Sequence, residues 1–399
     1  MVLKPRFRGF ICTTAHPNGC EKNVSDQIDY IKSNYKTKEG PKNVLVIGAS
    51  TGYGLASRIA VAFGSGSKTL GVSFEKEPTE KKTATPGWYN TVAFEKLAHE
   101  EGLYAKSING DAFSDEVKEE AIKIIKEDMG KIDLVVYSLA SPKRVHPKTK
   151  EVMSSVLKPL QESYKNKTVD FHTSVISEIE IERANEEEKR QTIAVMGGED
   201  WQLWIEALKE ADLLSEGVKT VAYSYIGPEL THPVYRDGTI GQAKLHLEKT
   251  AKKLHDFLST LNGQAYVSVN KALVTQASSA IPVVSLYISI LFKIMKEKGI
   301  HEGCIEQVQR LFDDRLYSGN LQLDDEGRIR LDDWEMREDV QAEVEKVWKI
   351  VSTENIEEIT DIKGMREEFF RLFGFCVEGI DYEKDVDIQL QIPSISQGL

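Results

Sequence analysis

One short stretch near the start of the chain limits the fold more than any other. Residues 43–47 (Asn-Val-Leu-Val-Ile) form an apolar run that ends at a glycine-rich turn. Leu55, Ile59 and Phe63 then recur every four residues, which is the spacing of a helix face. A short apolar run bounded by turn residues is typical of a parallel strand buried on both faces. We therefore predict a strand, a tight turn and a helix, the repeating unit of an α/β fold.

The same alternation continues along the chain. Further strands are expected at residues 69–74, 104–109, 133–138, 220–225 and 265–269. The expected helices are 52–63, 88–101, 114–130 and 239–261. Strand–helix alternation of this kind predicts an α/β, Rossmann-type, doubly wound parallel sheet.

The 399 residues exceed a minimal domain of this kind, and we expect one large domain with additions over residues 1–399. The additions are an N-terminal extension at 1–41, an insertion at 145–218 and a C-terminal extension at 300–399. The insertion is rich in Glu, Lys, Asn and Ser, and we expect it to be mostly helical and to lie over the sheet. The C-terminal extension is also expected to be helical, with a polar loop near 318–332, and these helices should cover the substrate site.

The turn after the first strand has the spacing G-x-x-x-G-x-G. Glycine suits this place because the turn is tight, the backbone must approach a pyrophosphate, and the helix must pack close to the sheet. The helix N-terminus also offers N–H groups and positive potential to phosphates. We predict a dinucleotide site that includes Gly48, Ala49, Ser50, Thr51, Gly52, Tyr53 and Gly54.

The second strand ends in Phe74 and Glu75, about twenty residues after the glycines. An acidic side chain here accepts hydrogen bonds from the adenosine ribose and repels a 2′-phosphate, which favours NADH over NADPH. Lys76 softens that discrimination, and a solvated strand end is the alternative interpretation of Glu75. Because ligands bind at the carboxyl ends of parallel strands, we place the adenine near Asp111 and Ala112. The same argument places the nicotinamide ribose near Leu139 and Ala140.

Tyr235 and Lys244 are the predicted catalytic pair. A neighbouring ammonium stabilises a phenolate, so such a pair makes tyrosine a better acid–base group near neutral pH. Residues that are about eight or nine apart on one helix do not converge well. We therefore expect Asp237-Gly238 to turn the chain and Thr239 to cap a helix that begins after Tyr235. By spacing alone, a surface tyrosine and a solvated lysine would be the better interpretation.

The chain resembles a known family at many points. The matching segments are Ala15-His-Pro-x-Gly-Cys20, Gly48 to Gly54, Pro86-Gly-Trp-Tyr-Asn90, Gly110-Asp-Ala-Phe-Ser-Asp115, Tyr137-Ser-Leu-Ala-Ser-Pro142, Val195-Met-Gly-Gly-Glu-Asp-Trp201, Tyr223-Ser-Tyr-Ile-Gly227, Lys293-Ile-Met-Lys-Glu-Lys-Gly299 and His301-Glu-Gly-Cys304. They are similar to the long, single-chain trans-2-enoyl-CoA reductases and the related enoyl-acyl-carrier-protein reductases of bacterial fatty-acid synthesis. Residues 151–190 are the least familiar part.

The resemblance implies an enzyme that uses NADH to saturate the carbon–carbon double bond of a 2-enoyl thioester. It implies that hydride reaches the β-carbon and that Tyr235 is the proton donor. It further implies that Tyr225 contacts substrate, and that Lys244 and the stretch Leu273, Val274 and Thr275 contact the cofactor. The thioester would be carried on coenzyme A or on acyl carrier protein, and we expect a monomer.

Two other functions are compatible with parts of the sequence. A carbonyl reductase or alcohol dehydrogenase would have the same nucleotide motif, since a fold does not fix a function. A dinucleotide-binding regulator without chemistry is the second alternative. The Tyr235 and Lys244 spacing, together with the family motifs, argues against both.

Charge and local composition exclude some other classes. The net charge of −12 disfavours binding to a nucleic-acid backbone, and the basic stretch 143–150 is best explained as a solvated loop. The first residues are basic but are followed by no long apolar run, so we expect no signal peptide and a cytoplasmic protein. Residues 272–292 are uncharged, yet Pro282 and four serines favour a buried core segment over a membrane span. The part 278–292 is either an acyl-chain wall or plain core.

Cys12, His16 and Cys20 have a spacing that could be taken for zinc ligands. They lack a clear fourth ligand and the usual close cysteine pair, so we predict no metal site.

Overall fold

The central sheet of the molecule is parallel throughout. A computed structural model describes residues 1–399 except 9–10, 38, 277, 279–280, 282 and 397–399. The strands of the sheet are β3 (Asn43–Ile47), β4 (Lys68–Ser73), β5 (Ala105–Asn109), β6 (Ile132–Tyr137), β11 (Leu214–Ser224), β12 (Gln264–Val269) and β13 (Ile329–Arg330). Within the described residues they lie in the order β13-β12-β11-β6-β3-β4-β5, and every neighbouring pair is parallel. The predicted Rossmann-type fold is confirmed.

Two strands differ from the prediction. β11 begins at Leu214, and its pairing with β6 shifts register before Lys219, so its first residues lack the apolar run of the others. β13 is a two-residue strand inside the segment that we expected to be a polar loop. A strand this short carries no readable alternation, because side-chain period cannot be recognised in two residues.

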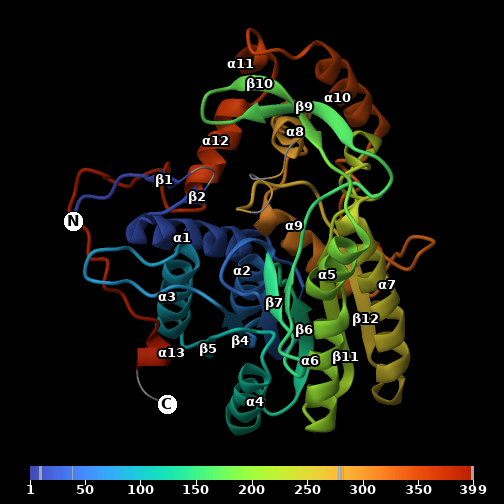
Figure 1. Ribbon diagram of the computed structural model, residues 1–399. Helices are drawn as coiled ribbons and strands as arrows, with labels where there is room; N and C mark the ends of the chain where they lie inside the picture. Colours follow the sequence, from blue (N-terminus) through green and yellow to red (C-terminus); the bar gives the residue numbers. More distant parts are fainter. Residues whose placement is uncertain (9–10, 38, 277, 279–280, 282, 397–399) are drawn as a thin grey trace.

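Helices cover both faces of the sheet (Figure 1). On β3, Val44 and Val46 face α1 (Pro17–Asn34), α2 (Gly52–Ile59), α3 (Pro86–Glu100) and α9 (Cys304–Leu311). Leu45 and Ile47 face α4 (Asp115–Ile124), α6 (Glu199–Glu210) and α7 (Thr239–Leu258). This alternation follows from the two-residue period of a strand and explains why the run is apolar throughout. Three of these helices are extended by further helical turns, Ala60–Gly64, Ile125–Met129 and Phe312–Leu316, and α7 by Ser259–Leu261.

The expectation of a mostly helical segment 145–218 is wrong for its first half. β7 (Lys143–Val145) pairs with β8 (Val152–Ser154), and β9 (Tyr164–Asp170) pairs with β10 (Val175–Ile181), both antiparallel. Only α5 (Glu186–Met196) and α6 are helices there. Ile176 and Ile179 of β10 pack on buried residues, while Glu178 between them and Glu180 after them are exposed. The charged composition therefore belongs to the solvated face of a hairpin rather than to a helix.

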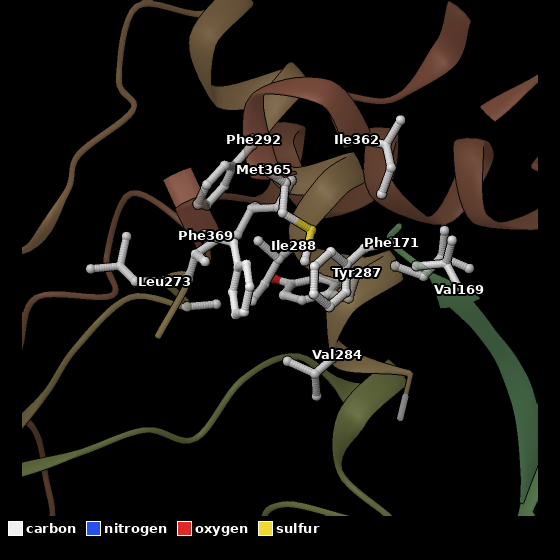
Figure 2. Close-up of a cluster of buried hydrophobic side chains, with 14 of the residues drawn as sticks. Val169, Phe171, Leu273, Val284, Tyr287, Ile288, Phe292, Ile362, Met365 and Phe369 are labelled. Carbon is white, nitrogen blue, oxygen red and sulfur yellow. The ribbon is translucent and has the colours of Figure 1, made fainter. Parts of the chain in front are cut away.

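The hairpin β9–β10 joins α8 (Val284–Glu297), α10 (Glu338–Ile350), α11 (Ile356–Ile359) and α12 (Ile362–Arg371) in a unit that we call the cap, at the top of Figure 1. Figure 2 shows its apolar interior, where Tyr287 and Phe292 of α8 meet Phe171, Met365 and Phe369. Leu273, which follows β12 after a short link, also packs in this cluster, so the cap lies at the carboxyl end of the sheet.

The stretch that could have been taken for a membrane span is divided by its own structure. Its helical part, α8, begins only at Val284. Among the described residues, no helix is long and apolar enough to cross a membrane.

The two ends of the described chain lie on the same side of the molecule (Figure 1). The amino group of Met1 donates a hydrogen bond of 2.8 Å to the carbonyl of Val386. The N-terminal extension contains the short pair β1 (Phe7–Arg8) and β2 (Ile11–Cys12), followed by α1. The last helix, α13 (Pro393–Ser396), docks on α3 through Ser394, whose hydroxyl donates to the buried Glu95.

Candidate active site

The glycine turn is built so that the backbone passes very close to its neighbours. Gly48 has a φ of +83°, and a Cβ added there would lie 2.3 Å from the carbonyl oxygen of Ser138 at the end of β6. A Cβ at Gly54 would lie 1.9 Å from the carbonyl oxygen of Gly48. Thr51 is the N-cap of α2, but its side chain makes no capping hydrogen bond. The start of α2 therefore keeps N–H groups for an external acceptor, which fits the phosphates of a dinucleotide.

Tyr53 lies in this turn, but its side chain points into the core. Its hydroxyl hydrogen-bonds to the carbonyl of Lys271 at 3.2 Å and to Oε1 of Gln307 at 3.1 Å. Its ring packs on that of Tyr223. The side chain of Tyr53 thus ties the glycine turn to the end of β12, so any cofactor contact at this residue would involve its backbone.

Glu75 follows β4 directly and faces the glycine turn. The hydroxyl of Ser50 donates to Oε1 of Glu75 at 2.6 Å. A Cβ at Gly87 would lie 2.1 Å from the same oxygen, so only glycine at the start of α3 leaves room for this carboxylate. Burial raises the pKa of Glu75, against the lowering effect of its hydrogen bonds. Phe74 beside it is 77% exposed and offers an open aromatic ring at the same strand end.

The segment after β5 is held by side chains of α4 and α6. The carbonyl of Ala112 accepts hydrogen bonds from the indole of Trp204 at 3.1 Å and from Nζ of Lys118 at 3.0 Å. Lys118 is buried and forms an ion pair of 2.8 Å with Asp200. Oδ1 of Asp111 accepts from the backbone N–H of Phe113. These contacts hold the segment that the sequence assigned to the adenine.

Leu139 and Ala140 follow β6, next to the glycine turn. The backbone N–H of Ser138 donates to the carbonyl of Ile47 at 2.8 Å, which fixes this strand end against β3. Leu139 is half-buried and Ala140 is exposed. β3 and β6 are the neighbours at which the strand order reverses, the place where α/β sheets bind ligands.

Tyr235 precedes α7 and Lys244 lies on its second turn, as the sequence predicted. The expected capping box is not formed: Gly238 is the N-cap, and Thr239 is the first helical residue. The hydroxyl of Thr239 donates instead to the carbonyl of Val156 and accepts from the N–H of Lys158. The side chain is therefore engaged by the insertion, which the local pattern could not reveal.

Two separate contacts bring the predicted catalytic residues to the end of β11. Nζ of Lys244 donates to the carbonyl of Tyr223 at 3.0 Å. Two residues further on, the ring of Tyr225 meets the ring of Tyr235 edge-on, with centroids 5.0 Å apart and an interplanar angle of 86°. Burial lowers the pKa of Lys244 to about 8, although Glu248 acts in the opposite direction. Burial, and then the charge of Glu335, raises the pKa of Tyr235.

Glu335, Tyr287 and Lys271 also belong to this site, and the sequence analysis missed them. Glu335 is fully buried and accepts hydrogen bonds from the hydroxyls of Tyr225 at 3.1 Å and Tyr287 at 2.6 Å. Lys271 is buried as well, over the ring of Phe292, and burial lowers its pKa to about 8. A charged residue directly after a buried strand was a usable signal for Lys271. Nothing local marks Glu335, which lies 110 residues from Tyr225.

The predicted cofactor stretch after β12 lies against the cap. Leu273 and Val274 are buried in its apolar cluster, and Thr275 and Ser278 exchange two hydrogen bonds, each from a backbone N–H to the other's hydroxyl. The N–H of Ala272 donates to Oε2 of Glu335 at 2.7 Å. This stretch is therefore fixed by side chains of the cap.

His16 has a structural task near the N-terminus. Its Nδ1 accepts a hydrogen bond from the N–H of Gly19 and so caps α1. Sγ of Cys12 donates to the carbonyl of Thr14. Within the described residues, no group of three His, Cys, Asp or Glu side chains could hold a metal ion.

Three family models match the chain. The model described as trans-2-enoyl-CoA reductase catalytic region matches residues 82–317. The NAD(P)H binding domain of trans-2-enoyl-CoA reductase matches residues 2–80, and an enoyl reductase FAD binding domain matches residues 323–386.

Residues 323–386 do not fit a flavin site in this chain. They form β13 and the helices α10 to α12, whose apolar side chains fill the cap. Among the described residues of this segment, every buried side-chain polar atom already has a hydrogen-bond partner. None is therefore left for a flavin to satisfy. The glycine turn suited to a dinucleotide lies at Gly48 to Gly54 instead. We therefore derive no step through a flavin.

Relatives and solved structures agree with the two larger family matches. The chain is 62% identical over 395 residues to trans-2-enoyl-CoA reductase [NADH] of Ruminiclostridium cellulolyticum, covering 99% of this chain and 100% of that protein. It is 62% identical over 399 residues to enoyl-[acyl-carrier-protein] reductase [NADH] of Coxiella burnetii, covering 99% and 98%.

Among solved structures, trans-2-enoyl-CoA reductase of Clostridium acetobutulicum in complex with NADH superposes with a TM-score of 0.96 at 46% identity, covering 98% of this chain and 99% of that one. The enzyme of Treponema denticola in complex with NAD gives a TM-score of 0.92 at 53% identity, covering 97% and 98%. The resemblance seen in the motifs is thus confirmed over nearly the whole chain. The chain belongs to the trans-2-enoyl-CoA reductase family, a family of NADH-dependent enoyl reductases built on a Rossmann-type fold.

Proposed function

We propose that this chain reduces the carbon–carbon double bond of trans-2-enoyl thioesters with NADH. One observation carries the proposal: the ring of Tyr235 lies against Tyr225 just beyond β11, on the same sheet edge as the glycine turn, and Lys244 contacts the end of that strand through the carbonyl of Tyr223. This position supports a role for Tyr235 as proton donor, because the cofactor site of this fold opens at the same edge. The names of the R. cellulolyticum and C. burnetii relatives support the same reaction.

The cofactor half of the site fits NADH. The uncapped start of α2 would hold the phosphates, and Glu75 would accept hydrogen bonds from the ribose and repel a 2′-phosphate. When bound, NADH supplies the hydride. Lys244, which is held at the end of β11, would contact the nicotinamide ribose.

The substrate half stabilises charge. Reduction at the β-carbon places negative charge on the thioester oxygen as an enolate. Tyr235 would transfer its hydroxyl proton to that oxygen. The resulting enol would gain a proton from solvent at the α-carbon and return its O–H proton to the Tyr235 phenolate. A donor aimed at charge that develops only in the transition state lowers the barrier. The ammonium of Lys244 would favour transfer of that hydrogen by stabilising the resulting phenolate.

Residues 278–292 were predicted to be either an acyl-chain wall or plain core. The residues of α8 from Val284 to Phe292 are almost wholly buried in the cap, which favours plain core for this part. Residues 279, 280 and 282 of the suggested acyl wall lie outside the described residues.

The first experiment follows NADH absorbance with crotonyl-CoA and with a longer enoyl-CoA. We expect oxidation by the wild type, much slower oxidation of NADPH, and no reaction with simple ketones. Reduction of ketones but not of enoyl thioesters would point to a carbonyl reductase. Binding of NADH without reduction of either class would revive a regulatory role. Measurement of kcat/KM with enoyl-CoA and with enoyl-acyl-carrier-protein of the same chain length would establish which carrier is preferred.

We further propose that the enzyme acts as a monomer, because the N-terminal extension, the cap and the C-terminal segment cover much of the sheet and its helices. Sedimentation at micromolar concentration tests this, and a mass of twice the chain would contradict it. The cytoplasmic location stays a prediction from the sequence.

A further inference from the structure

A buried carboxylate between β13 and α10, that of Glu335, contacts both sides of the site. Oε1 of Glu335 accepts hydrogen bonds from the hydroxyls of Tyr225 and Tyr287, and Oε2 accepts from the N–H of Ala272. Glu335 is 0% exposed, and its own backbone carbonyl accepts from the side chain of Gln341. All three groups donate to the carboxylate: the hydrogen bonds from Tyr287 and Ala272 are 2.6 and 2.7 Å long, and that from Tyr225 is 3.1 Å long. Glu335 is therefore rigidly held.

The direction of one of these hydrogen bonds has a chemical consequence. A phenol has one hydrogen to donate, and Tyr225 gives its hydrogen to Glu335. Tyr225 is then left with oxygen lone pairs only, which cannot stabilise a negatively charged thioester oxygen. The hydroxyl of Tyr235 donates to no residue in the described part of the chain, and its ring is fixed by the edge-on contact with Tyr225. The contact with Glu335 therefore leaves Tyr235 as the donor.

The other oxygen of Glu335 acts on the cofactor side. Ala272, whose N–H it accepts, immediately precedes the stretch Leu273 to Thr275 that we assign to cofactor contact. The preceding carbonyl, that of Lys271, is held by Tyr53 of the glycine turn. One carboxylate thus fixes both the substrate-side tyrosine and the strand end beside the cofactor.

We propose that Glu335 is a positioning residue that makes Tyr235 the hydrogen donor by engaging Tyr225, and that holds the cofactor stretch through Ala272. The proposal rests on the proposed function. It assigns a role in the reduction site to the segment 323–386, which matches a family model described as FAD binding.

Glu335→Gln and Glu335→Ala separate the two tasks. The amide of Gln has one acceptor oxygen, which Ala272 requires because a backbone N–H can only donate. The NH₂ group then faces the tyrosine hydroxyls, which can accept, and the hydrogen of Tyr225 is released toward the substrate. Alanine removes both contacts. Asp332→Asn and Asp332→Ala are matched controls, because Asp332 is also buried and lies three residues away but pairs with Arg330.

The expected results differ between the two variants. Glu335→Gln lowers kcat with crotonyl-CoA by about 10- to 100-fold, since misplaced groups cost this much, and leaves the dissociation constant of NADH within about twofold. Glu335→Ala lowers kcat and also weakens NADH binding about tenfold or more, measured by NADH fluorescence. In a Tyr225→Phe background, the loss caused by Glu335→Gln shrinks to less than about threefold, because the residue acts through Tyr225.

Three results would overturn the proposal. One is a loss from Glu335→Gln that adds fully to that of Tyr225→Phe. A second is equal losses in the Asp332 controls, and the third is unchanged NADH binding in Glu335→Ala. If Glu335→Ala does not fold, the proposal is tested by Glu335→Gln alone and in combination with Tyr225→Phe. If the wild type binds NADH but does not reduce crotonyl-CoA, the proposed function fails, and NADH binding by Glu335→Ala against Asp332→Ala decides the Ala272 contact.

Discussion

The two halves of the site are assembled in different ways. The cofactor half comes mainly from β3, β4, β5 and β6 and the turns that follow them, within residues 43–140. Only Lys244 and the stretch Leu273 to Thr275 come from further along the chain. Its contacts are mostly backbone contacts, such as the close approach of Gly48 to Ser138. The substrate half joins Tyr225 and Tyr235 to Glu335, which precedes α10 and lies 110 residues beyond Tyr225.

This difference shows what each half requires. A pyrophosphate is bound by backbone N–H groups, so the essential property is a backbone conformation, which glycine spacing encodes locally. A developing charge on a thioester must be met by one oriented hydroxyl. The orientation of Tyr235 depends on Tyr225, and that of Tyr225 depends on a carboxylate from a distant segment. The cofactor half is therefore local, and the substrate half is tertiary.

The largest expected effect is on the substrate half. Tyr235→Phe removes the donor and keeps the ring packed on Tyr225. We expect kcat with crotonyl-CoA to fall about 10²- to 10³-fold, as for the loss of an oxyanion donor. The dissociation constant of NADH should stay unchanged if the halves are independent. A matching loss of NADH binding would show that the comparison between the halves is wrong.

The next effect breaks the cofactor half. Gly48→Ala combines a φ of +83° with a Cβ only 2.3 Å from a backbone oxygen. We expect NADH binding to weaken at least about tenfold and the free energy of unfolding to fall by about 1–3 kcal/mol. Gly66→Ala is the control, since Gly66 also has a positive φ (+68°) but open space around its Cβ. Equal effects of the two variants on NADH binding would contradict the steric argument.

A smaller effect concerns the choice of cofactor. Glu75→Ala removes the carboxylate that repels a 2′-phosphate, so the ratio of kcat/KM for NADPH to that for NADH should rise about tenfold. Glu77→Ala, an exposed glutamate two residues further on, should leave this ratio unchanged. An unchanged ratio in Glu75→Ala would favour a solvated strand end.

The smallest effect is a pH dependence. The pKa of Lys244 is lowered to about 8, so its ammonium is lost as the pH rises through that value. We expect kcat/KM to fall as the pH rises through 8, and to be about tenfold lower at about pH 9 than on its plateau at low pH. Lys244→Arg keeps its charge and should move this fall to higher pH. Lys271→Arg is the control, because the pKa of Lys271 is also about 8, and the fall should persist there.

Several features of the structure could not be predicted from the sequence, for identifiable reasons. The hairpin β9–β10 carries its charges on a solvated face, so its composition resembled that of a helix. Thr239 has the right neighbours for a capping box, but its hydroxyl is occupied by Val156 of the insertion. Tyr53 lies in the cofactor turn, but its side chain bonds to Lys271 and Gln307. In each case a contact with a distant segment overrode the local pattern.

The sequence by itself determined the parallel sheet, the glycine turn, the place of Glu75 and the positions of Tyr235 and Lys244 around the start of α7. These properties follow from side-chain period and backbone conformation, which act over a few residues. Only the tertiary structure decided that Glu335 engages Tyr225 and that the cap closes over the end of β12. A buried carboxylate is stable only where several donors converge on it, and no local pattern records which distant donors those will be.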